Sequence, residues 1–555
     1  MEKNKIVVCA TICLALFFTG CASVAESGTV YTPVDYTEAD AVSAEIDRIG
    51  KMSNDQAVKA LWRSKLLVMH TKENARALQT LDDCETAVVS LYKKALAEKK
   101  YIDALRYYES LAACSYKALD SLEKDAQSLN ELSCQNVPGL GSKAERAEGE
   151  NAKVSLYVKG TVTVLVDKGI KVEKGMGFAD AVLGSGFFIS KDGYIVTNNH
   201  VISDCVDPKY EGFSRLYIKL AEDPDTRIPA KVVGYDSVLD LALLKAEVDA
   251  PYYFELGSSS GLEAGDKVYA IGSPLGLERT LTSGIVSATD RKLFTIGNVF
   301  QIDAAVNSGN SGGPLIDEQG RVQAVVFAGV QNYQGLNFAI PVEYLKYELP
   351  VLYSGGKREH AWIASYGRTK KMPGAGTKNE GLLVQYVMPG GSAYLSGIAA
   401  GDTITSFNGS KIDSLESLQN DFMEQKADMI ATLCVVDKDG IEKECIVYLD
   451  KRPEQPGYEV YSHDVMALSF LPIVGMELVP VSTESHRKYS VVSVLKGSIA
   501  DETGFSEHDP VDIIKIQFDE NKTAAFIELY TKKRKNGYMD VTIGLTAPMD
   551  SPYYF

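Results

Sequence analysis

The sequence predicts a multidomain protein, in which an α-helical N-terminal region precedes an all-β barrel domain and two smaller α+β modules. Over residues 38–137, apolar side chains recur at three- and four-residue spacing with almost no Gly or Pro, which is the helical pattern. Over residues 153–350 the period changes to two, in short β-branched runs that Gly, Asp and Pro interrupt. Beyond residue 358, strand-like runs, a Gly-rich turn and a short helical pattern occur and then recur further along the chain.

Length and composition limit the function classes. At 555 residues the chain is too long for one core, and about three to five domains are expected. With 45% hydrophobic and 24% charged residues, most of the chain should fold. The net charge of -17 argues against nucleic acid, or an anionic membrane surface, as the main partner. No segment has the pattern of a nucleotide-binding P-loop or a metal cluster, so the sequence predicts no cofactor and no metal site.

Residues 1–21 have the composition of an export signal, with two lysines before the apolar run Ile6–Phe18. This run is too short to span a bilayer comfortably, which favours a signal peptide over a permanent anchor. The small residues before Cys21 resemble a bacterial lipobox, which implies lipidation of Cys21, membrane anchoring and a tether over residues 22–37. The alternative is cleavage after Ser23-Val24-Ala25, which would release a soluble periplasmic protein. Both interpretations place the mature chain outside the cytoplasm.

The helical region has two interpretations. Residues 91–108 resemble one tetratricopeptide-type helical hairpin, with the small Ala104 where the two helices touch. Such arrays need about three units for stability, so a helical bundle of unspecified role is an equal alternative. A scaffold or docking role is a hypothesis. Residues 138–152, rich in Gly and mixed charges, are interpreted as a linker, and a strand is predicted from Val154 to Val166.

A serine held between glycines is the strongest functional signal in the chain, in Gly309-Asn310-Ser311-Gly312-Gly313. Glycine lets the backbone curl, so that the amides of Gly309 and Ser311 can point to one oxyanion site beside the serine hydroxyl. We therefore predict that Ser311 is a nucleophile, with Gly309 and Ser311 as the oxyanion hole.

A nucleophilic serine needs a base, and His200 is the only histidine between residues 138 and 350. An acid that begins a buried strand should orient the imidazole. Asp240, which precedes Leu241-Ala242-Leu243-Leu244, meets that description, whereas Asp236 is expected to be a solvated turn residue. The predicted catalytic residues are therefore His200, Asp240 and Ser311.

Several segments of the barrel domain resemble the HtrA (Deg) family of envelope serine proteases. They are Gly184–Val201, Val233–Lys245, Gly265–Ser287 and Gln301–Leu315. The order His, Asp, Ser is also that of chymotrypsin. The resemblance implies a trypsin-like serine protease domain over residues 153–350, a chymotrypsin-like double β-barrel with its active site in the cleft between the barrels.

The same resemblance implies a specificity pocket lined by Val306, Ala328 and Val330. These side chains are apolar, so a small or medium aliphatic residue is expected before the cleaved bond rather than Lys or Arg. Family members are commonly trimers or larger cages, which implies a homo-oligomer. In such relatives the loop of the serine can rest in an inactive form until a ligand reorders it.

Residues 358–452 resemble a PDZ domain, from the strand-like run Gly381–Met388 through a Gly-rich turn to the helix-like segment Ser414–Met423. PDZ domains bind an extended peptide at a sheet edge, with backbone amides holding its C-terminal carboxylate. The corresponding loop maps onto Trp362, Ile363, Ala364 and Ser365, with Ala364 in place of the usual glycine. The resemblance therefore implies C-terminal peptides as partners of this domain.

Residues 458–555 are interpreted as a diverged second PDZ-like domain, because turn and core residues repeat at a spacing of 107 residues. The residues Val384, Val387, Gly390, Ala393, Gly397 and Asp402 become Val491, Val494, Gly497, Ala500, Gly504 and Asp509. Its peptide loop has no clear place near Phe470–Ile473, so a structural or oligomer-contact role and peptide binding both remain open.

Cysteine spacing gives one further expectation. If Asp439-Gly440 forms a two-residue hairpin turn, Cys434 and Cys445 lie opposite each other across the two strands. A disulfide in an oxidising compartment and two unpaired apolar cysteines are both compatible with this arrangement.

The leading functional hypothesis is an ATP-independent serine endopeptidase of the bacterial cell envelope that degrades misfolded or damaged proteins by a His-Asp-Ser acyl-enzyme mechanism. Two alternatives are kept. One is a chaperone or scaffold with little proteolysis, and the other is a PDZ-gated sensor protease with one regulatory substrate.

Overall fold

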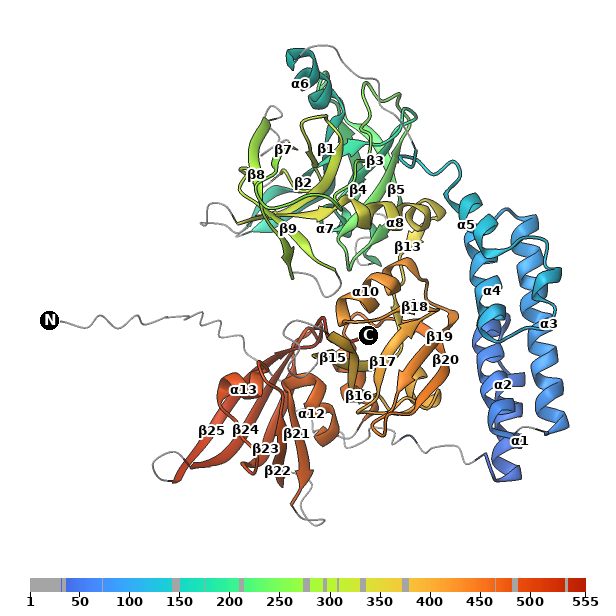
Figure 1. The fold of residues 1–555 in the computed structure, drawn as a ribbon. Helices are drawn as coiled ribbons and strands as arrows, with labels where there is room; N and C mark the ends of the chain where they lie inside the picture. Colours follow the sequence, from blue (N-terminus) through green and yellow to red (C-terminus); the bar gives the residue numbers. More distant parts are fainter. Residues whose placement is uncertain are drawn as a thin grey trace.

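The computed structural model describes residues 31, 36–71, 73–141, 150–173, 175–208, 214–272, 280–292, 297–306, 309–329, 336–371, 379–464, 466–481, 488–534 and 538–555. The predicted signal peptide and Cys21 lie outside these residues. Within them, no helix combines the length and the apolar character needed to cross a membrane. Figure 1 shows a helical region, a barrel domain and two sheet modules, which the chain forms in that order.

The helical region packs its first helices side by side (Figure 1). The side chain of Asn74 caps one of them by accepting from the amides of Arg76 and Ala77. Ala104 is fully buried beside Tyr92 and Leu129, so its small side chain does lie at a helix contact. The elements are α1 (Ala39–Gly50), η1 (Asn54–Gln56), α2 (Ala57–Thr71), α3 (Ala75–Ala97), α4 (Tyr101–Ala113), η2 (Leu119–Ser121) and α5 (Ala126–Cys134).

The barrel domain consists of two barrels, antiparallel throughout except for the parallel pairing of β13 with β5. In the first, the strand order is β13-β5-β4-β1-β2-β3-β6, and a further pairing of β5 with β6 closes the ring. In the second, the closed order is β10-β11-β12-β9-β8-β7. The first-barrel strands are β1 (Thr161–Glu173), β2 (Met176–Phe188), β3 (Tyr194–Thr197), β4 (Arg215–Lys219), β5 (Ile228–Asp236), β6 (Leu241–Ala246) and β13 (Gly356–Lys357). The second-barrel strands are β7 (Lys267–Gly272), β8 (Thr280–Arg291), β9 (Val299–Ile302), β10 (Pro314–Ile316), β11 (Val322–Gly329) and β12 (Asn337–Pro341).

Helix α6 (Glu150–Lys159) leads into β1, α7 (Asn199–Val206) connects β3 to β4, and α8 (Val342–Ser354) connects β12 to β13. The strand predicted from Val154 is therefore wrong before Thr161, and the predicted linker overlaps α6. Residues 150–159 are rich in helix-forming Glu, Lys and Ala, and they turn into β1 at Gly160, where a Cβ would approach Tyr252 to 2.6 Å. Tyr157 of α6 packs into the barrel core, which explains why this segment is helical and not extended.

The first sheet module (residues 361–451) has the strand order β14-β20-β19-β17-β16-β15, with β18 paired to β17. A capping box at Ser414 and Ser417 begins α10, as the sequence pattern indicates. The elements are β14 (Ala361–Trp362), β15 (Ser365–Lys371), β16 (Asn379–Val387), α9 (Ser392–Leu395), β17 (Thr403–Phe407), β18 (Ser410–Lys411), α10 (Leu415–Glu424), β19 (Met429–Val436) and β20 (Glu442–Lys451).

The register of β19 and β20 places Cys434 opposite Glu444 and Leu433 opposite Cys445. The expected pairing of Cys434 with Cys445 is therefore wrong, and both thiols are free. The turn spans Asp437 to Ile441 and not two residues. This change in loop length shifts the pairing by one residue, which turns the two cysteines to opposite faces of the sheet.

The second sheet module (residues 456–549) repeats the first. His508 donates its amide to the carbonyl of Val491 at 2.8 Å, as Gly401 does to that of Val384. Between β23 and β24, however, the described residues form a turn and no counterpart of α10. The elements are α11 (Pro456–His463), α12 (Met466–Val474), β21 (Met476–Pro480), β22 (Lys488–Val494), α13 (Ile499–Thr503), β23 (Pro510–Phe518), β24 (Ala524–Arg534) and β25 (Tyr538–Pro548).

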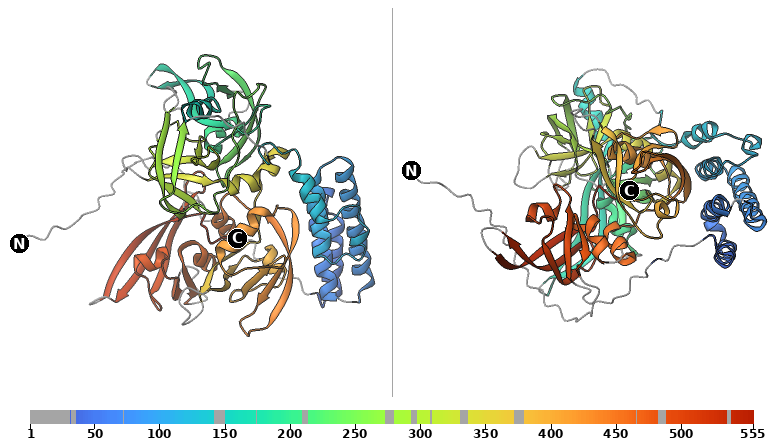
Figure 2. Two further views of the ribbon diagram at one scale, coloured as in Figure 1. Left: turned by 45° about the horizontal axis from the view of Figure 1, so that its top comes forward. Right: turned by 60° about the horizontal axis from the view of Figure 1, so that its bottom comes forward.

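The helical region packs against β19 and β20 of the first sheet module (Figure 2). The indole of Trp62 is fully buried there and donates its Nε1–H to the carbonyl of Ile446 at 3.0 Å. Ser110 accepts from the amide of Ile430 at 3.1 Å, and Lys59 forms an ion pair of 2.6 Å with Asp450. The first sheet module therefore lies between the helical region and the second module.

Candidate active site and peptide-binding groove

His200 and Asp240 meet because β3 pairs with β6 in antiparallel register. His200 is the second residue of α7, directly after β3, and Asp240 directly precedes β6. The Nδ1 atom of His200 lies 2.7 Å from Oδ2 of Asp240, and the backbone amide of His200 donates to Oδ1 at 2.7 Å. An Nδ1–H bonded to the carboxylate leaves Nε2 as a proton acceptor.

The backbone of Asp240 is held in the left-handed region, at a φ of +55°. Its carbonyl accepts from the side-chain amide of Asn198 at 2.9 Å and from the backbone amide of Asn199 at 3.2 Å. The two asparagine residues before the histidine thus hold the backbone of Asp240. The Asp240 side chain is 13% exposed and that of His200 48%, so the imidazole is open to a substrate.

Ser311 lies in the turn before β10, where glycine is required by close contacts. Gly312 has a φ of +87°, and a Cβ on it would lie 2.1 Å from the carbonyl oxygen of Ser185. A Cβ on Gly313 would lie 2.1 Å from the carbonyl oxygen of Ile271. The backbone of the serine turn therefore fits against both barrels only without these side chains.

Ser185 of β2 holds the serine turn at two points. Its hydroxyl donates to the carbonyl of Gly309 at 2.6 Å, and its amide donates to the carbonyl of Ser311 at 2.8 Å. Thr197 donates to the carbonyl of Ser185 at 2.7 Å and fixes this strand in turn. Sequence reasoning did not single out Ser185, although it lies in the quoted Gly184-Ser185-Gly186 stretch.

The hydroxyl of Ser311 donates to the carbonyl of Phe327 at 3.1 Å. Across the described residues, no hydrogen bond joins Ser311 to His200. A Cβ on Gly312 would lie 3.1 Å from the amide nitrogen of Asn198, so the serine turn lies next to the segment that leads to His200, while the Ser311 proton points to β11. Gly309 has a φ of +102°, and the peptide bond that carries its amide begins at Ser308, outside the described residues.

The three predicted specificity residues are described unequally. Val306 is partly buried against the core of the second barrel. Ala328 belongs to β11, but its side chain lies outside the described part of the chain, as does Val330 altogether.

The predicted peptide loop connects β14 to β15 in the first sheet module. Trp362 and Ile363 are buried, and Ala364 has a φ of +63°, a left-handed conformation that explains why glycine is usual at this position. Ser365 begins β15, the edge strand of its sheet. Helix α10 lies alongside, since the amide of Leu415 bonds Thr369 at 3.0 Å. The edge strand and this helix therefore lie side by side, as the two sides of the predicted peptide-binding groove.

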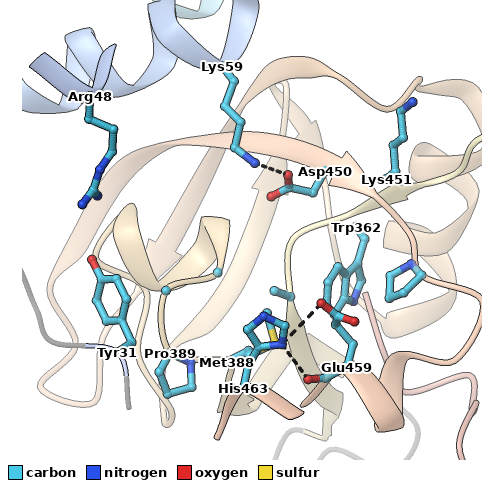
Figure 3. A pocket seen from close by; sticks show the side chains of 14 residues that line it. Tyr31, Arg48, Lys59, Trp362, Met388, Pro389, Asp450, Lys451, Glu459 and His463 are labelled. Carbon is cyan, nitrogen blue, oxygen red and sulfur yellow. Dashed lines mark hydrogen bonds and ion pairs between the residues drawn. The ribbon is translucent and has the colours of Figure 1, made fainter. Parts of the chain in front are cut away.

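A cavity of about 630 Å³ borders the same loop at Trp362 and Ala364 (Figure 3). Figure 3 shows Lys59 reaching Asp450 from the helical region, and His463 beside Glu459 of α11 at 3.3 Å. The loop is thus the place where the helical region and both sheet modules meet.

A buried ionic cluster connects the barrel domain to the first sheet module. Asp236 is fully buried and both of its carboxylate oxygens lie 3.0 Å from Nε2 of His360. The expectation that Asp236 is a solvated turn residue is therefore wrong. Arg358 lies 2.8 Å from Glu348, also fully buried. The residues Asp236, Glu348 and His360 are close enough to hold a metal ion, but the guanidinium already supplies a cation there.

The charges of this cluster shift its carboxylates in opposite directions. Burial would raise the pKa of Asp236, but His360 and Arg358 outweigh it and hold that pKa below its ordinary value. Burial raises the pKa of Glu348, against the opposing effect of Arg358.

Family models match most of the described chain. They are a trypsin-like peptidase domain over residues 184–325, a PDZ domain over 366–435, a TP0546 family PDZ domain over 457–549 and a domain of unknown function (DUF8517) over 40–133. The last matches the helical region and assigns it no role.

Similar curated proteins are described as probable periplasmic serine endoproteases, DegP-like. The one from Marinomonas sp. is 32% identical over 381 residues, which is 66% of this chain and 76% of that protein. The one from Bartonella henselae is 40% identical over 281 residues, 49% of this chain and 54% of that protein. Among solved structures, an HtrA-type protease AlgW with tripeptide is 26% identical, with a TM-score of 0.45, and covers 54% of this chain and 96% of that one.

Two closed barrels, a serine turn and a His–Asp pair, followed by PDZ domains, define a trypsin-like serine protease with appended PDZ domains. The chain belongs to the HtrA (DegP-like) family and is a serine endopeptidase. The two sheet modules are accordingly its first and second PDZ domains.

Proposed function

We propose that the chain is an ATP-independent endopeptidase that degrades misfolded or damaged proteins in the bacterial cell envelope, with His200, Asp240 and Ser311 as its catalytic residues. The observation that carries the catalytic assignment is the 2.7 Å contact between Nδ1 of His200 and Asp240, beside the serine turn. The relatives described as periplasmic support the location. Export by residues 1–21, a lipid anchor at Cys21 and a homo-oligomer are part of this proposal.

The proposed mechanism moves one proton twice. Nε2 of His200 accepts the Ser311 proton while Oγ bonds to the substrate carbonyl carbon, and the carbonyl oxygen becomes an oxyanion. The amides of Gly309 and Ser311 bind that oxyanion, and Asp240 stabilises the imidazolium. His200 then gives the proton to the leaving amine as the C–N bond breaks. Water, deprotonated by His200, hydrolyses the acyl-enzyme in the same way.

Before attack, the Ser311 hydroxyl must leave the Phe327 carbonyl and turn towards His200. The 3.1 Å hydrogen bond from Ser311 to the Phe327 carbonyl supports a resting form of the active site, which a substrate or another ligand converts to the active form. For the substrate residue before the cleaved bond, we propose a small or medium aliphatic side chain, with Val306, Ala328 and Val330 as the pocket.

Labelling of the purified full chain with a fluorophosphonate probe tests the nucleophile. We expect one labelled serine, Ser311, and loss of both labelling and casein turnover in Ser311→Ala. Asp240→Asn should lower casein turnover by about 10⁴ because the imidazole loses its correct tautomer. The matched control is Asp192→Asn, an exposed acid in the turn before β3, which should retain the wild-type rate. Labelling that survives Ser311→Ala would contradict the assignment.

A PDZ-gated protease is the second candidate, favoured by the groove between β15 and α10 and by the position of the Ser311 hydroxyl. In this version a peptide in the groove raises the labelling rate of Ser311. A labelling rate that no peptide changes, with intact casein turnover, would favour constitutive quality control instead. A scaffold with little proteolysis predicts no labelling under either condition.

A further inference from the structure

The edge of β15 is already paired with a segment of the same chain. The amide of Ser365 donates to the carbonyl of Phe555 at 3.0 Å, and the amide of Phe555 donates to the carbonyl of Ser365 at 3.0 Å. Two residues on, the amide of Gly367 donates to the carbonyl of Tyr553 at 3.1 Å. These bonds form an antiparallel ladder, with a bridge between Tyr366 and Tyr554. Figure 1 accordingly places the C label beside β15 and α10, away from the second PDZ domain.

The side chains of this segment fill the groove. Phe555 is 2% exposed and belongs to the apolar core of the first PDZ domain, together with Leu418 and Phe422 of α10. A Cβ on Gly367 would lie 2.2 Å from the carbonyl oxygen of Leu383 and 3.2 Å from the Phe555 ring, so glycine at this position leaves the ring in close contact with the backbone of β15. The guanidinium of Arg368 lies 4.5 Å from the ring centroid of Tyr553, a cation–π contact.

Polar contacts hold the segment on both sides of the ladder. Gln419 of α10 donates its side-chain amide to the carbonyl of Pro552 at 2.6 Å. Arg452 forms a two-point ion pair with Asp550, at 2.5 and 3.1 Å, before the segment enters the groove. Tyr554 turns the other way and donates its hydroxyl to the carbonyl of Pro472 in α12. One short segment therefore bonds to both PDZ domains.

We propose that residues 551–555 are an intramolecular ligand of the first PDZ groove, and that a peptide binding there must displace them. This inference rests on the proposed role of that groove in peptide binding. The displacing ligand is an extended peptide with an aromatic residue at the position of Phe555, because the apolar core of the domain surrounds that ring and leaves it 2% exposed. Strand addition to a sheet edge supplies the remaining contacts.

Occupation in cis lowers the affinity for peptides in trans. A tethered ligand acts at an effective concentration in the millimolar range, and the apparent dissociation constant of the peptide equals its intrinsic value divided by the fraction of open grooves. Release of the segment should therefore tighten peptide binding by about tenfold or more. It should also leave the edge of β15 unpaired and break the contact of Tyr554 with α12.

The experiment uses the full chain with Ser311→Ala, so that the probe is not cleaved. Fluorescence anisotropy follows binding of the labelled hexapeptide Asp-Ser-Pro-Tyr-Tyr-Phe, the sequence of residues 550–555. Phe555→Ala, and separately Asp550→Ala, should each bind the probe about tenfold more tightly than the parent chain. Asp550→Ala releases the segment without changing the groove. Phe526→Ala is the matched control, because this phenylalanine of β24 is 49% exposed and lies outside the groove.

Amide hydrogen exchange gives a readout independent of the probe. The amides of Ser365 and Gly367 should exchange at least tenfold faster in the two release variants and unchanged in Phe526→Ala. If Ser365 and Gly367 exchange at the same rate in every variant, residues 551–555 do not occupy the groove. If exchange becomes faster in the release variants but they bind the probe no more tightly, or not at all, the segment does not compete with peptides. Absence of Ser311 labelling in the wild-type chain would contradict the proposed protease function, and the exchange and binding results could still be interpreted.

Discussion

Both carboxylate oxygens of Asp236 lie 3.0 Å from Nε2 of His360, in a hydrogen-bonded contact that joins the end of β5 to the segment entering the first PDZ domain. The two residues are 124 positions apart in the chain and both are buried. Asp236 also accepts from the amides of Val238 and Leu239, at 2.8 and 3.2 Å. The carboxylate therefore shapes the turn that carries Asp240 while it holds the PDZ domain to the barrel.

His360→Phe should destabilise the chain, because it removes the imidazole that contacts both oxygens of the buried Asp236 carboxylate. Loss of a hydrogen-bond partner of a buried polar group typically costs about 1–3 kcal/mol, and more for a charged group. Urea denaturation of the barrel and the first PDZ domain measures this loss. His463→Phe changes an exposed histidine and should stay within about 0.5 kcal/mol of wild type. Equal stability of the two variants would mean that the pair does not hold the domains together.

The stability of the contact between α4 and the first PDZ domain should depend on pH through Glu109. Burial raises the pKa of its carboxyl from 4.5 to about 7, with Lys426 opposing the shift. The folded state therefore holds this proton more tightly than the unfolded state. The contribution to stability is fully present below about pH 4.5 and is lost as the pH rises through 7.

Glu109→Gln should consequently match wild type near pH 4.5 and exceed its stability at pH 8, by up to about 3 kcal/mol at 1.36 kcal/mol per pKa unit. Thermal unfolding at both pH values measures the difference. Glu131→Gln, at an exposed glutamate of α5, is the control and should show no pH-dependent gain. A gain at pH 4.5 as large as that at pH 8 would refute burial of the charge as the cause.

Trp62→Ala should release the helical region from the first PDZ domain. The side chain is fully buried and bonds Ile446, and truncation of a buried Trp typically costs about 3–5 kcal/mol. Exchange of the Ile430 amide, which bonds Ser110 across the same contact, should become faster. Leu78→Ala, at a residue 47% exposed, should leave that amide protected. Unchanged exchange in Trp62→Ala would show that the docking does not depend on this contact.

Ser185→Ala should slow the proposed chemistry without preventing folding. Loss of its hydroxyl frees the Gly309 carbonyl, and a misplacement of about 1 Å near the reacting atoms can cost 10²-fold in rate. We expect kcat on a peptide substrate to fall ten- to a hundredfold, with little change in KM, because Ser185 touches the turn and not the substrate. Ser354→Ala at the exposed end of α8 is the control. A rise in KM with constant kcat would argue against a positioning role.

Features that depend on short stretches of sequence can be predicted from it, whereas features that depend on contacts between distant residues cannot. The glycine cradle of Ser311 and the Asn198–His200 stretch are short motifs, and the residues they name lie together in the structure. Asp236 was misassigned because its partner His360 is distant in the chain and contributes no local pattern. The predicted pairing of Cys434 with Cys445 is wrong because a hairpin loop of a different length shifts every residue pair of the two strands by one.

Other features have no periodic signal at all. Residues 551–555 are too few, and too irregular, to show a strand pattern, so their pairing with β15 appears only in three dimensions. The sequence does not predict helix α6 because its apolar residues Val154, Leu156 and Val158 stand at every second position, as in a strand. In both cases tertiary packing, of Phe555 or of Tyr157, decides the local conformation.

The two hydrogen bonds of Ser185 cross from one barrel to the other. The strand that carries the donors belongs to the first barrel, and the turn that accepts them leads into β10 of the second. The 2.6 Å hydrogen bond from Ser185 to Gly309 is lost if its two atoms move about 1 Å further apart. The conformation of the serine turn therefore depends on the distance between the barrels. Any force that parts the barrels by that amount, from pressure to a ligand wedged in the cleft, would release the nucleophile turn before either barrel unfolds.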